Sequence, residues 1–262
     1  MRQLFPVFQF IQYWLYKVNE HSLHSPFLYR FYTEVIKPDD KAGFEQLEDL
    51  RKTLLSDSNK LQVVELGAGS RIDNGKNRKV ADIVRHASTP PSFSRLLNRI
   101  ITQQQFSTIL ELGTSLGLNT LYMQQACPYG TIYTLEGSPA IAERAKHHFD
   151  EFGASNIHII EGNIDDTLGL ALAKAKQIDL AYLDANHCYE PTLRYFESIL
   201  PKLHHQSIVV IDDIHWSKEM NKAWKELIKH PGVSLSVDLF EGGLLFFDRE
   251  IKKEHYVLSF KR

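Results

Sequence analysis

The chain has little cysteine, no excess of positive charge and no long apolar run. Two cysteines in 262 residues are too few for a disulfide framework, which favours a reducing, cytoplasmic location. The formal net charge is -2, which does not indicate the basic surface that nucleic-acid binding requires. No nucleic-acid partner is therefore expected. Repeats and low-complexity tracts are missing too. The 43% of apolar residues instead indicates a globular protein with an ordinary core.

The most apolar stretch is N-terminal and too short to cross a membrane. Spacings of four and three predict one apolar face of a helix, formed by Leu4, Phe8, Ile11, Leu15 and Val18. Glutamines interrupt the run, and no small-residue cleavage site follows. We expect no membrane span, and a helix that packs against the main domain or a second subunit, which would make a homodimer through the N-terminal helices. Interfacial contact with a membrane is the alternative.

The chemistry is organised around residues 108 to 120, which read TILELGTSLGLNT. An apolar run that ends in an acid, followed by two glycines four residues apart, describes a buried strand turning into a helix. Gly113 lets the backbone approach a ligand, and Gly117 lets the helix lie close on the sheet. A second β-rich run, residues 131 to 136, ends in Glu136, where a nucleotide-binding unit places the acid that holds a ribose.

Two kinds of nucleotide-binding turn compete for this stretch. An NAD fingerprint needs a third glycine at position 115, which is serine. The Glu-x-Gly-x-x-x-Gly spacing instead resembles motif I of the class I S-adenosylmethionine-dependent methyltransferases. The resemblance covers about residues 92 to 248. It implies S-adenosylmethionine as the cofactor, contacted by Glu111, Gly113, Thr114, Ser115, Gly117, Glu136, Gly137, Asn163, Ile164 and Asp184.

Apolar runs separated by helical segments predict an α/β fold with a parallel sheet covered on both faces. The resemblance makes this a Rossmann-like, doubly wound, mostly parallel seven-stranded sheet with an antiparallel closing hairpin. We expect a helical N-terminal extension over residues 1–91 and the cofactor-binding methyltransferase domain over 92–262. Residues 255 to 260 are one strand more than this pattern needs, and have no place in it.

A second glycine turn at residues 62 to 70, QVVELGAGS, is similar to motif I in miniature. A cofactor turn must lead into a helix and then into a strand that ends in an acid. A polar, charged loop and a helix at about 80 to 87 follow here, and no second strand is expected. We therefore interpret this turn as separate from the cofactor site.

The remaining candidate residues follow the later strands. Ligands bind outside the carboxyl ends of strands in such sheets, where Asp184 and Asp212 are placed. The strings DANHCYE at 184 to 190 and DDIH at 212 to 215 look like a small-molecule O- or N-methyltransferase branch, some of whose members hold a divalent ion. By that resemblance Asp184, Asp212 and Asp213 would bind Mg²⁺ or another divalent cation.

Methyl transfer also needs a base, and a histidine, which normally titrates near pH 6.5, suits that role. His187 is the first candidate and His215 the second. The predicted function is therefore transfer of a methyl group from S-adenosylmethionine to oxygen or nitrogen of a small-molecule acceptor. Two alternatives stay open: a cofactor-binding sensor or scaffold without turnover, and an NAD-type oxidoreductase.

Overall fold

The structure is a computed structural model that describes residues 4–64 and 77–260. It divides into two compact units, one made of residues 1–38 and 176–262 and the other of residues 39–175. We call them the split unit and the continuous unit. The predicted boundary after residue 91 stays a prediction. Most of the second glycine turn, from Glu65 onward, lies outside the described residues.

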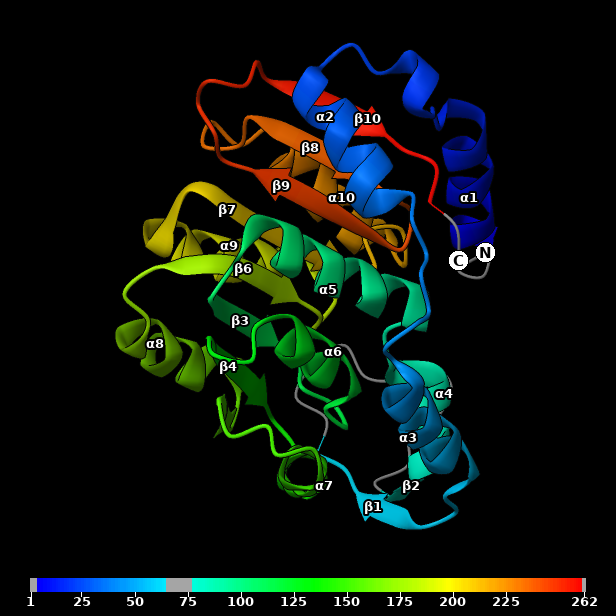
Figure 1. The fold of residues 1–262 in the computed structure, drawn as a ribbon, viewed down its shortest axis with the longest axis vertical. Coiled ribbons are helices and arrows are strands. Elements are labelled where there is room, and N and C mark those ends of the chain that lie inside the picture. Colours follow the sequence, from blue (N-terminus) through cyan, green and yellow to red (C-terminus); the bar gives the residue numbers. More distant parts are fainter. Residues whose placement is uncertain (1–3, 65–76, 261–262) are drawn as a thin grey trace. The chain divides into compact units, whose positions relative to one another are not determined.

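The continuous unit contains three parallel strands, β3 (Thr108–Leu112), β4 (Thr131–Glu136) and β5 (Ile157–Glu161), in the order β3-β4-β5. These are the first three strands predicted from the apolar runs. The helices that connect or follow them are α6 (Leu118–Ala126), α7 (Pro139–Glu151) and α8 (Ile164–Lys174), and α5 (Pro91–Gln104) precedes β3. Parallel strands joined by helices place the carboxyl ends of β3, β4 and β5 at one edge of the sheet (Figure 1).

The first part of the continuous unit holds α3 (Glu45–Ser56), a small hairpin and α4 (Val80–Ala87), the last as predicted. The hairpin pairs β1 (Lys60–Gln62) with β2 (Asn77–Lys79) in antiparallel register. The segment expected to be a polar, charged loop ends in the short strand β2. The helix α4 leads into the helix α5 and not into a strand that ends in an acid, as was expected. Three polar residues in a row give β2 no apolar alternation from which a strand could be recognised.

The split unit contains five strands in the order β10-β8-β9-β7-β6. β6 (Ile178–Leu183) and β7 (Leu203–Asp212) are parallel, while β9 (Gly242–Phe246) is antiparallel to both β7 and β8 (Leu235–Asp238). This confirms the closing hairpin. The unplaced C-terminal segment forms β10 (Glu254–Val257), parallel to β8. The main-sheet strands of the two units number eight rather than the seven expected.

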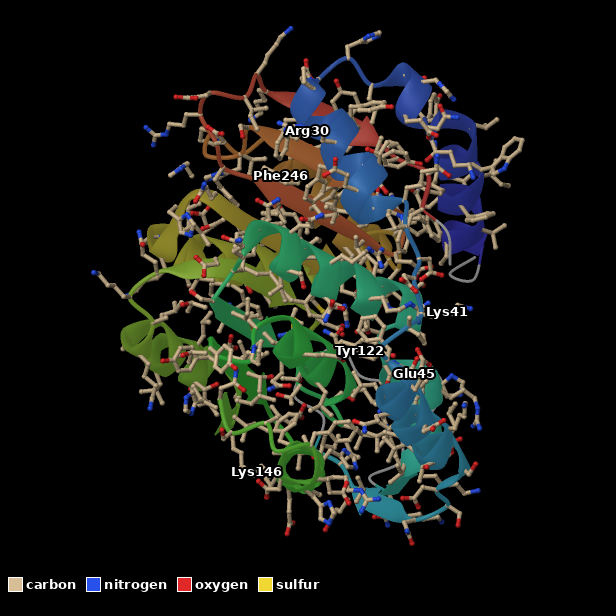
Figure 2. All side chains as sticks on the ribbon, in the orientation of Figure 1. Arg30, Lys41, Glu45, Tyr122, Lys146 and Phe246 are labelled. Carbon is tan, nitrogen blue, oxygen red and sulfur yellow. The ribbon has the colours of Figure 1, made fainter. Side chains whose placement is uncertain are left out.

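The helical elements of the split unit are α1 (Leu4–Tyr16), η1 (Glu20–Ser22), α2 (Pro26–Phe31), η2 (Tyr32–Ile36), α9 (Tyr189–Ile199), η3 (Leu200–Lys202) and α10 (Lys218–Leu227). Helices cover both faces of β9 (Figure 1). On one face Phe246 meets Phe27 and Phe31 of α2 edge-on (Figure 2). On the other face a Cβ added at Gly243 would lie 2.4 Å from the Trp224 ring of α10, so only glycine fits there.

The apolar stripe of α1 does not face the unit to which the helix belongs. Phe8, Ile11 and Leu15 are 50 to 64% exposed, whereas Gln9 and Tyr13 are buried. The Tyr13 hydroxyl donates to the Leu258 carbonyl oxygen at 2.7 Å, which ties α1 to the end of the chain. The predicted buried stripe was therefore wrong for this unit, because periodicity identifies an apolar face without showing what covers it. Among the described residues, no helix is long and apolar enough to cross a membrane.

Candidate active site

The turn after β3 has the backbone conformation that its glycines suggested. Gly113, Ser115 and Gly117 have φ values of 100°, 50° and 80°. These left-handed conformations are easy for glycine and uncommon for other residues, so Ser115 is strained. The N–H groups of Gly113 and Thr114 both donate to the Leu135 carbonyl oxygen of β4, at 3.0 and 3.1 Å. The turn is thus shaped by β4 before any ligand binds.

Glu111 is fully buried, and its carboxylate holds the turn together. Its oxygens accept hydrogen bonds from Asn119 at 3.1 Å, from Thr120 at 2.5 Å and from Thr134 at 2.7 Å. The Thr114 and Thr134 hydroxyls lie 2.6 Å apart, which extends the network into the turn. A buried carboxylate requires such partners to offset its lost hydration. The predicted contact of Glu111 with the cofactor stays a prediction, and its visible role is to brace the turn.

Two neighbours in α7 support the same turn, and sequence reasoning missed one of them. The sequence predicted that Gly117 lets its helix pack closely on the sheet. Instead, a Cβ at Gly117 would lie 2.5 Å from the Phe149 ring, so this glycine permits close packing on α7. The buried His148 lies with Nδ1 2.8 Å from the Leu116 carbonyl oxygen. Because a carbonyl only accepts, Nδ1 carries the proton. Burial lowers the pKa of His148, which keeps the imidazole neutral.

Glu136 ends β4 with its carboxylate directed into the turn. Oε2 accepts the Ser115 N–H and Oε1 accepts the Ser138 N–H, both at 2.9 Å. A carboxylate has about four acceptor positions, and hydroxyl groups as well as N–H groups can donate to it. Ser138 precedes α7, whose first residue is Pro139, but its hydroxyl does not cap the helix. That hydroxyl accepts the Val64 N–H at 3.2 Å.

The pair predicted to hold an adenine ring follows β5. Asn163 is the N-cap of α8, where its side chain accepts the Asp165 N–H at 3.1 Å. Ile164 begins the helix and is half-buried. Gly137 is also half-buried and lies between Glu136 and Ser138. The continuous unit therefore supplies, at the carboxyl ends of consecutive parallel strands, a braced glycine turn, a carboxylate and a polar-apolar pair.

The split unit brings a different group together at the ends of β6 and β7. Asp212 is buried, and its pKa is raised well above the usual range, first by burial and then by the charges of Asp184 and Asp213 and a hydrogen bond with Asp184. Asp213 has a left-handed backbone, with φ of 54°, and donates its N–H to the Glu241 carbonyl oxygen at 2.8 Å. The three carboxyl groups therefore interact strongly, and the fold favours a proton or a cation among them.

His187 lies between two of these acids. Its Nε2 is 3.5 Å from Asp184 Oδ1 and its Nδ1 is 3.9 Å from Asp213 Oδ2, both longer than good hydrogen bonds. Within the described part of the chain, the buried Nδ1 atom has no hydrogen-bond partner. Asn186 and His187 have φ values of 66° and 39°, a strained pair of the kind that gathers at functional sites. The next residue, Cys188, has a pKa raised by burial, so its thiol stays protonated.

His215 is held more tightly than His187. Its Nε2 lies 2.7 Å from Asp238 Oδ2, its Nδ1 lies 3.0 Å from the Asn221 amide, and Phe240 stacks on the ring at 5.3 Å. Sequence reasoning missed Asp238, although it ends β8 just as the other candidate acids follow their strands. With both nitrogens engaged, His215 is the less available base, and its catalytic role stays a prediction.

Carboxylate oxygens are the ligands that Mg²⁺ prefers, so the donor set Asp184, Asp212 and Asp213 fits the predicted cation. In the described ranges, however, no three His, Cys, Asp or Glu side chains are arranged so that they could hold a metal ion. The cation thus remains a prediction.

Known proteins share parts of this chain. Residues 110–214 match a family model described as a methyltransferase domain. A catechol O-methyltransferase from Niastella koreensis is 30% identical over 130 residues, which are 48% of this chain and 58% of that relative. The chain therefore matches little more than half the length of this curated relative.

Solved structures share the fold. A putative caffeoyl-CoA O-methyltransferase from Staphylococcus aureus has a TM-score of 0.55 at 20% identity, covering 63% of this chain and 87% of its own. An O-methyltransferase from Bacillus cereus, in complex with SAH, has a TM-score of 0.56 at 17% identity, covering 82% and 94%. These structures confirm the Rossmann-like fold. The family model and the curated relative support the resemblance stated from the sequence.

Proposed function

We propose that this chain, which contains a methyltransferase domain of the class I fold, transfers a methyl group from S-adenosylmethionine to an oxygen atom of a small-molecule acceptor. The observation that carries the proposal is the braced turn of the continuous unit, where Glu136 ends β4 with its carboxylate held by the N–H groups of Ser115 and Ser138. The catechol O-methyltransferase relative and the O-methyltransferase neighbours favour oxygen over nitrogen as the acceptor atom.

In this proposal each part of the turn has its own task. Glu136 accepts hydrogen bonds from the ribose hydroxyls, and the Ser115 and Ser138 N–H groups orient its carboxylate. Asn163 and Ile164 hold the adenine, and the backbone of Gly113, Thr114, Ser115, Gly117 and Gly137 approaches the rest of the cofactor. Asp184 contacts the cofactor or the acceptor. A sulfonium has no pyrophosphate to cradle, which agrees with a serine in place of the third glycine of an NAD turn.

The proposed base is His187. Methyl transfer is a displacement at carbon, so the protein has to align the acceptor with the methyl group and remove the hydroxyl proton. Among the described residues the Nδ1 atom of His187 has no hydrogen-bond partner, whereas both nitrogens of His215 are engaged. The carboxylates on either side of the ring would stabilise the imidazolium that forms, because opposite charges within a few ångström attract.

A divalent cation is the second component of the proposal. Asp184, Asp212 and Asp213 would hold it, and it would lower the pKa of an acceptor hydroxyl. Support comes from the raised pKa of Asp212, because burial and the neighbouring acids make its ionisation costly without a balancing charge. We expect exhaustive chelation to abolish methyl transfer and added magnesium to restore it. Full activity in the chelated protein would refute the cation and leave the carboxylates as hydrogen-bond acceptors.

The activity is tested by calorimetric titration with S-adenosylmethionine, S-adenosylhomocysteine and NAD, followed by a methyl-transfer assay with catechol. We expect both sulfur compounds to bind, NAD to give no heat, and labelled methyl to appear on catechol. Binding without transfer to any hydroxylated acceptor would support the sensor or scaffold, and binding of NAD alone would support the oxidoreductase.

A further inference from the structure

The helix α1 of the split unit turns its apolar side outward. Among the residues of α1 whose burial is described, every exposed one is apolar or aromatic, and its two glutamines are buried or half-buried. The exposed residues are Val7, Phe8, Phe10, Ile11, Trp14, Leu15 and Tyr16, with exposed fractions of 47% to 70%. Contiguous apolar surface of this kind marks a site of interaction with a protein or a membrane.

The split unit holds α1 in this orientation through the opposite side of the helix. Gln9 accepts a hydrogen bond from the buried Asn221 amide at 3.1 Å, and the Tyr13 hydroxyl donates to the Leu258 carbonyl oxygen at 2.7 Å. The Tyr13 hydroxyl also accepts the Phe260 N–H at 3.0 Å. A rotation of α1 that buried its apolar side would break these bonds and leave buried polar groups unpaired. The outward direction of the apolar side is therefore built into the fold.

The exposed side chains form a ridge rather than a pocket. At 3.6 residues per turn, all of them except Tyr16 fall within one half of the helix circumference, along its length from Val7 to Leu15. A helix that lies in the plane of a membrane surface buries such a side about 5–10 Å into the boundary between headgroups and acyl chains. Tryptophan and tyrosine, present here as Trp14 and Tyr16, are the residue types that favour this boundary.

The charges next to this ridge are positive. The first 19 residues of the chain contain two cations, Arg2 and Lys17, and no acid. On α10 and the turn after it, spacings of four, three and four place four exposed lysines on one side, Lys218, Lys222, Lys225 and Lys229. Lys225 lies close to α1, because it lines the same cavity as Gln12 and Tyr16.

The acids of α10 are directed to a neighbouring helix. Glu219 accepts the Tyr189 N–H at 3.3 Å, and Glu226 accepts the Tyr189 hydroxyl at 3.1 Å. The lysine side of α10 therefore keeps its positive charge beside the apolar ridge. Anionic lipids attract such lysines while the acyl region takes up apolar side chains.

We infer that α1 docks this protein on a membrane surface that contains anionic lipids, with the ridge in the boundary region and the lysines of α10 facing the headgroups. A second copy of the chain fits this face less well. Two copies that met through the same ridge would bring equal positive segments together, and like charges across an interface are unfavourable.

The test is sedimentation of the full-length protein with vesicles of phosphatidylcholine alone and of phosphatidylcholine mixed with phosphatidylglycerol. We expect the protein to sediment with the mixed vesicles and much less with phosphatidylcholine alone. High salt should weaken the binding, because it screens the attraction between lysines and headgroups. A protein that stays in the supernatant with the mixed vesicles would overturn the inference.

Two leucine variants show whether the ridge makes the contact. Leu15 is 64% exposed on α1, and Leu170 is 57% exposed on α8 of the continuous unit, so both can become glutamine without loss of the core. Leu15→Gln should weaken binding to the mixed vesicles about tenfold, because it removes apolar burial, while Leu170→Gln should bind as the wild type does. Equal binding by the two variants would contradict the role of α1.

Lysine variants test the electrostatic part. Lys218→Gln and Lys225→Gln should each weaken binding about fivefold, the scale expected for one lysine near an anionic surface. Lys52→Gln, at an exposed position of α3, is the matched control and should have no effect. If all three variants bind as the wild type does, the lysines of α10 do not face the membrane and this part of the inference is wrong.

Tryptophan fluorescence separates insertion of α1 from adhesion by charge alone. Trp14 is 60% exposed on the ridge, whereas Trp216 and Trp224 are 37% and 2% exposed. Mixed vesicles with brominated acyl chains should quench the wild type and leave Trp14→Phe almost unquenched. Equal quenching of both proteins would overturn the inference. Light scattering without vesicles tests the second copy, since a dimer that Leu15→Gln converts to a monomer would show that another copy covers the ridge.

Discussion

Carboxylates that look alike in the sequence have different surroundings in the folded chain. Glu111, Glu136 and Asp212 each lie at the carboxyl end of a strand. Glu111 is buried under three side-chain donors, Glu136 is held by two backbone N–H groups, and Asp212 is crowded by other acids. Position at a strand end therefore predicts a place in the site, while hydrogen-bond partners decide the role.

Replacing Glu136 tests the proposed ribose contact. Charge-assisted hydrogen bonds contribute about 1.5–3 kcal/mol, so Glu136→Ala should weaken S-adenosylhomocysteine binding by about ten- to a hundredfold in a calorimetric titration. Thermal unfolding of the variant shows whether loss of the Ser115 and Ser138 bonds also destabilises the turn. Glu65→Ala, in the second glycine turn, should leave affinity almost unchanged. The reverse pattern would mean that the other turn binds the cofactor.

Replacing His187 tests the base. General acid–base groups typically contribute about 10²- to 10⁴-fold, so His187→Ala should lose that much turnover while its affinity for S-adenosylhomocysteine stays the same. His215→Gln is the comparison, because removing this buried partner of Asp238 should mainly lower the unfolding temperature. If His187→Ala keeps its turnover and His215→Gln loses it, the base has been assigned to the wrong histidine.

At the scale of elements, alanine substitutions at two glycines near α7 test the contact between the glycine turn and this helix. Gly117 and Gly153 both have positive φ, but a Cβ would meet the Phe149 ring only at Gly117, since nothing lies within 4 Å at Gly153. Both alanine variants bear the left-handed backbone cost of about 1–2 kcal/mol. Gly117→Ala should lose more stability in urea unfolding and also bind cofactor less tightly. Equal losses in the two variants would show that α7 does not constrain the turn.

Local sequence patterns predicted the ends of helices well where a residue type has a single physical role, such as a serine that caps a helix. Ser25 and Ser217 cap α2 and α10 through the N–H groups of Leu28 and Met220, as their positions before a helical pattern indicated. Signals that depend on distant partners failed. The pairing of β10 with β8 and the hydrogen bond from His148 to the Leu116 carbonyl oxygen each join segments whose proximity no local pattern encodes. The stripe of α1 is exposed because periodicity does not show what covers an apolar face.

At the scale of the whole molecule, the fold class followed from the order of apolar runs, yet the compact units did not. Residues 1–38 and 176–262 form one unit, and the composition does not change at residues 38 and 175. Only the tertiary contacts therefore reveal the division. The same holds for the candidate site. Its strand-end acids were predictable, while Asp238, Asn221 and Gln9 form one network across more than 200 residues of sequence.

The stability of the whole chain should fall in mild acid, because each unit contains a histidine whose pKa is lowered mainly by desolvation. These are the buried His148 in the continuous unit and the more exposed His255 in the split unit. A histidine with a folded pKa below its unfolded value of about 6.5 binds its proton more readily after unfolding. The stability that this histidine contributes is fully present above the unfolded pKa. It is lost as the pH falls through the unfolded pKa toward the lower folded pKa.

Asp212 acts in the opposite sense, because its raised pKa makes the folded state bind a proton more readily than the unfolded state between about pH 3.9 and the folded pKa. Variants separate the two effects. Between pH 7.5 and about pH 5.5, the unfolding temperature of His148→Gln and His255→Gln should fall less than that of the wild type, since glutamine cannot gain the proton. His147→Gln, at an exposed neighbour, should follow the wild-type curve. Parallel curves for all four proteins would show that neither imidazole controls the acid sensitivity of the fold.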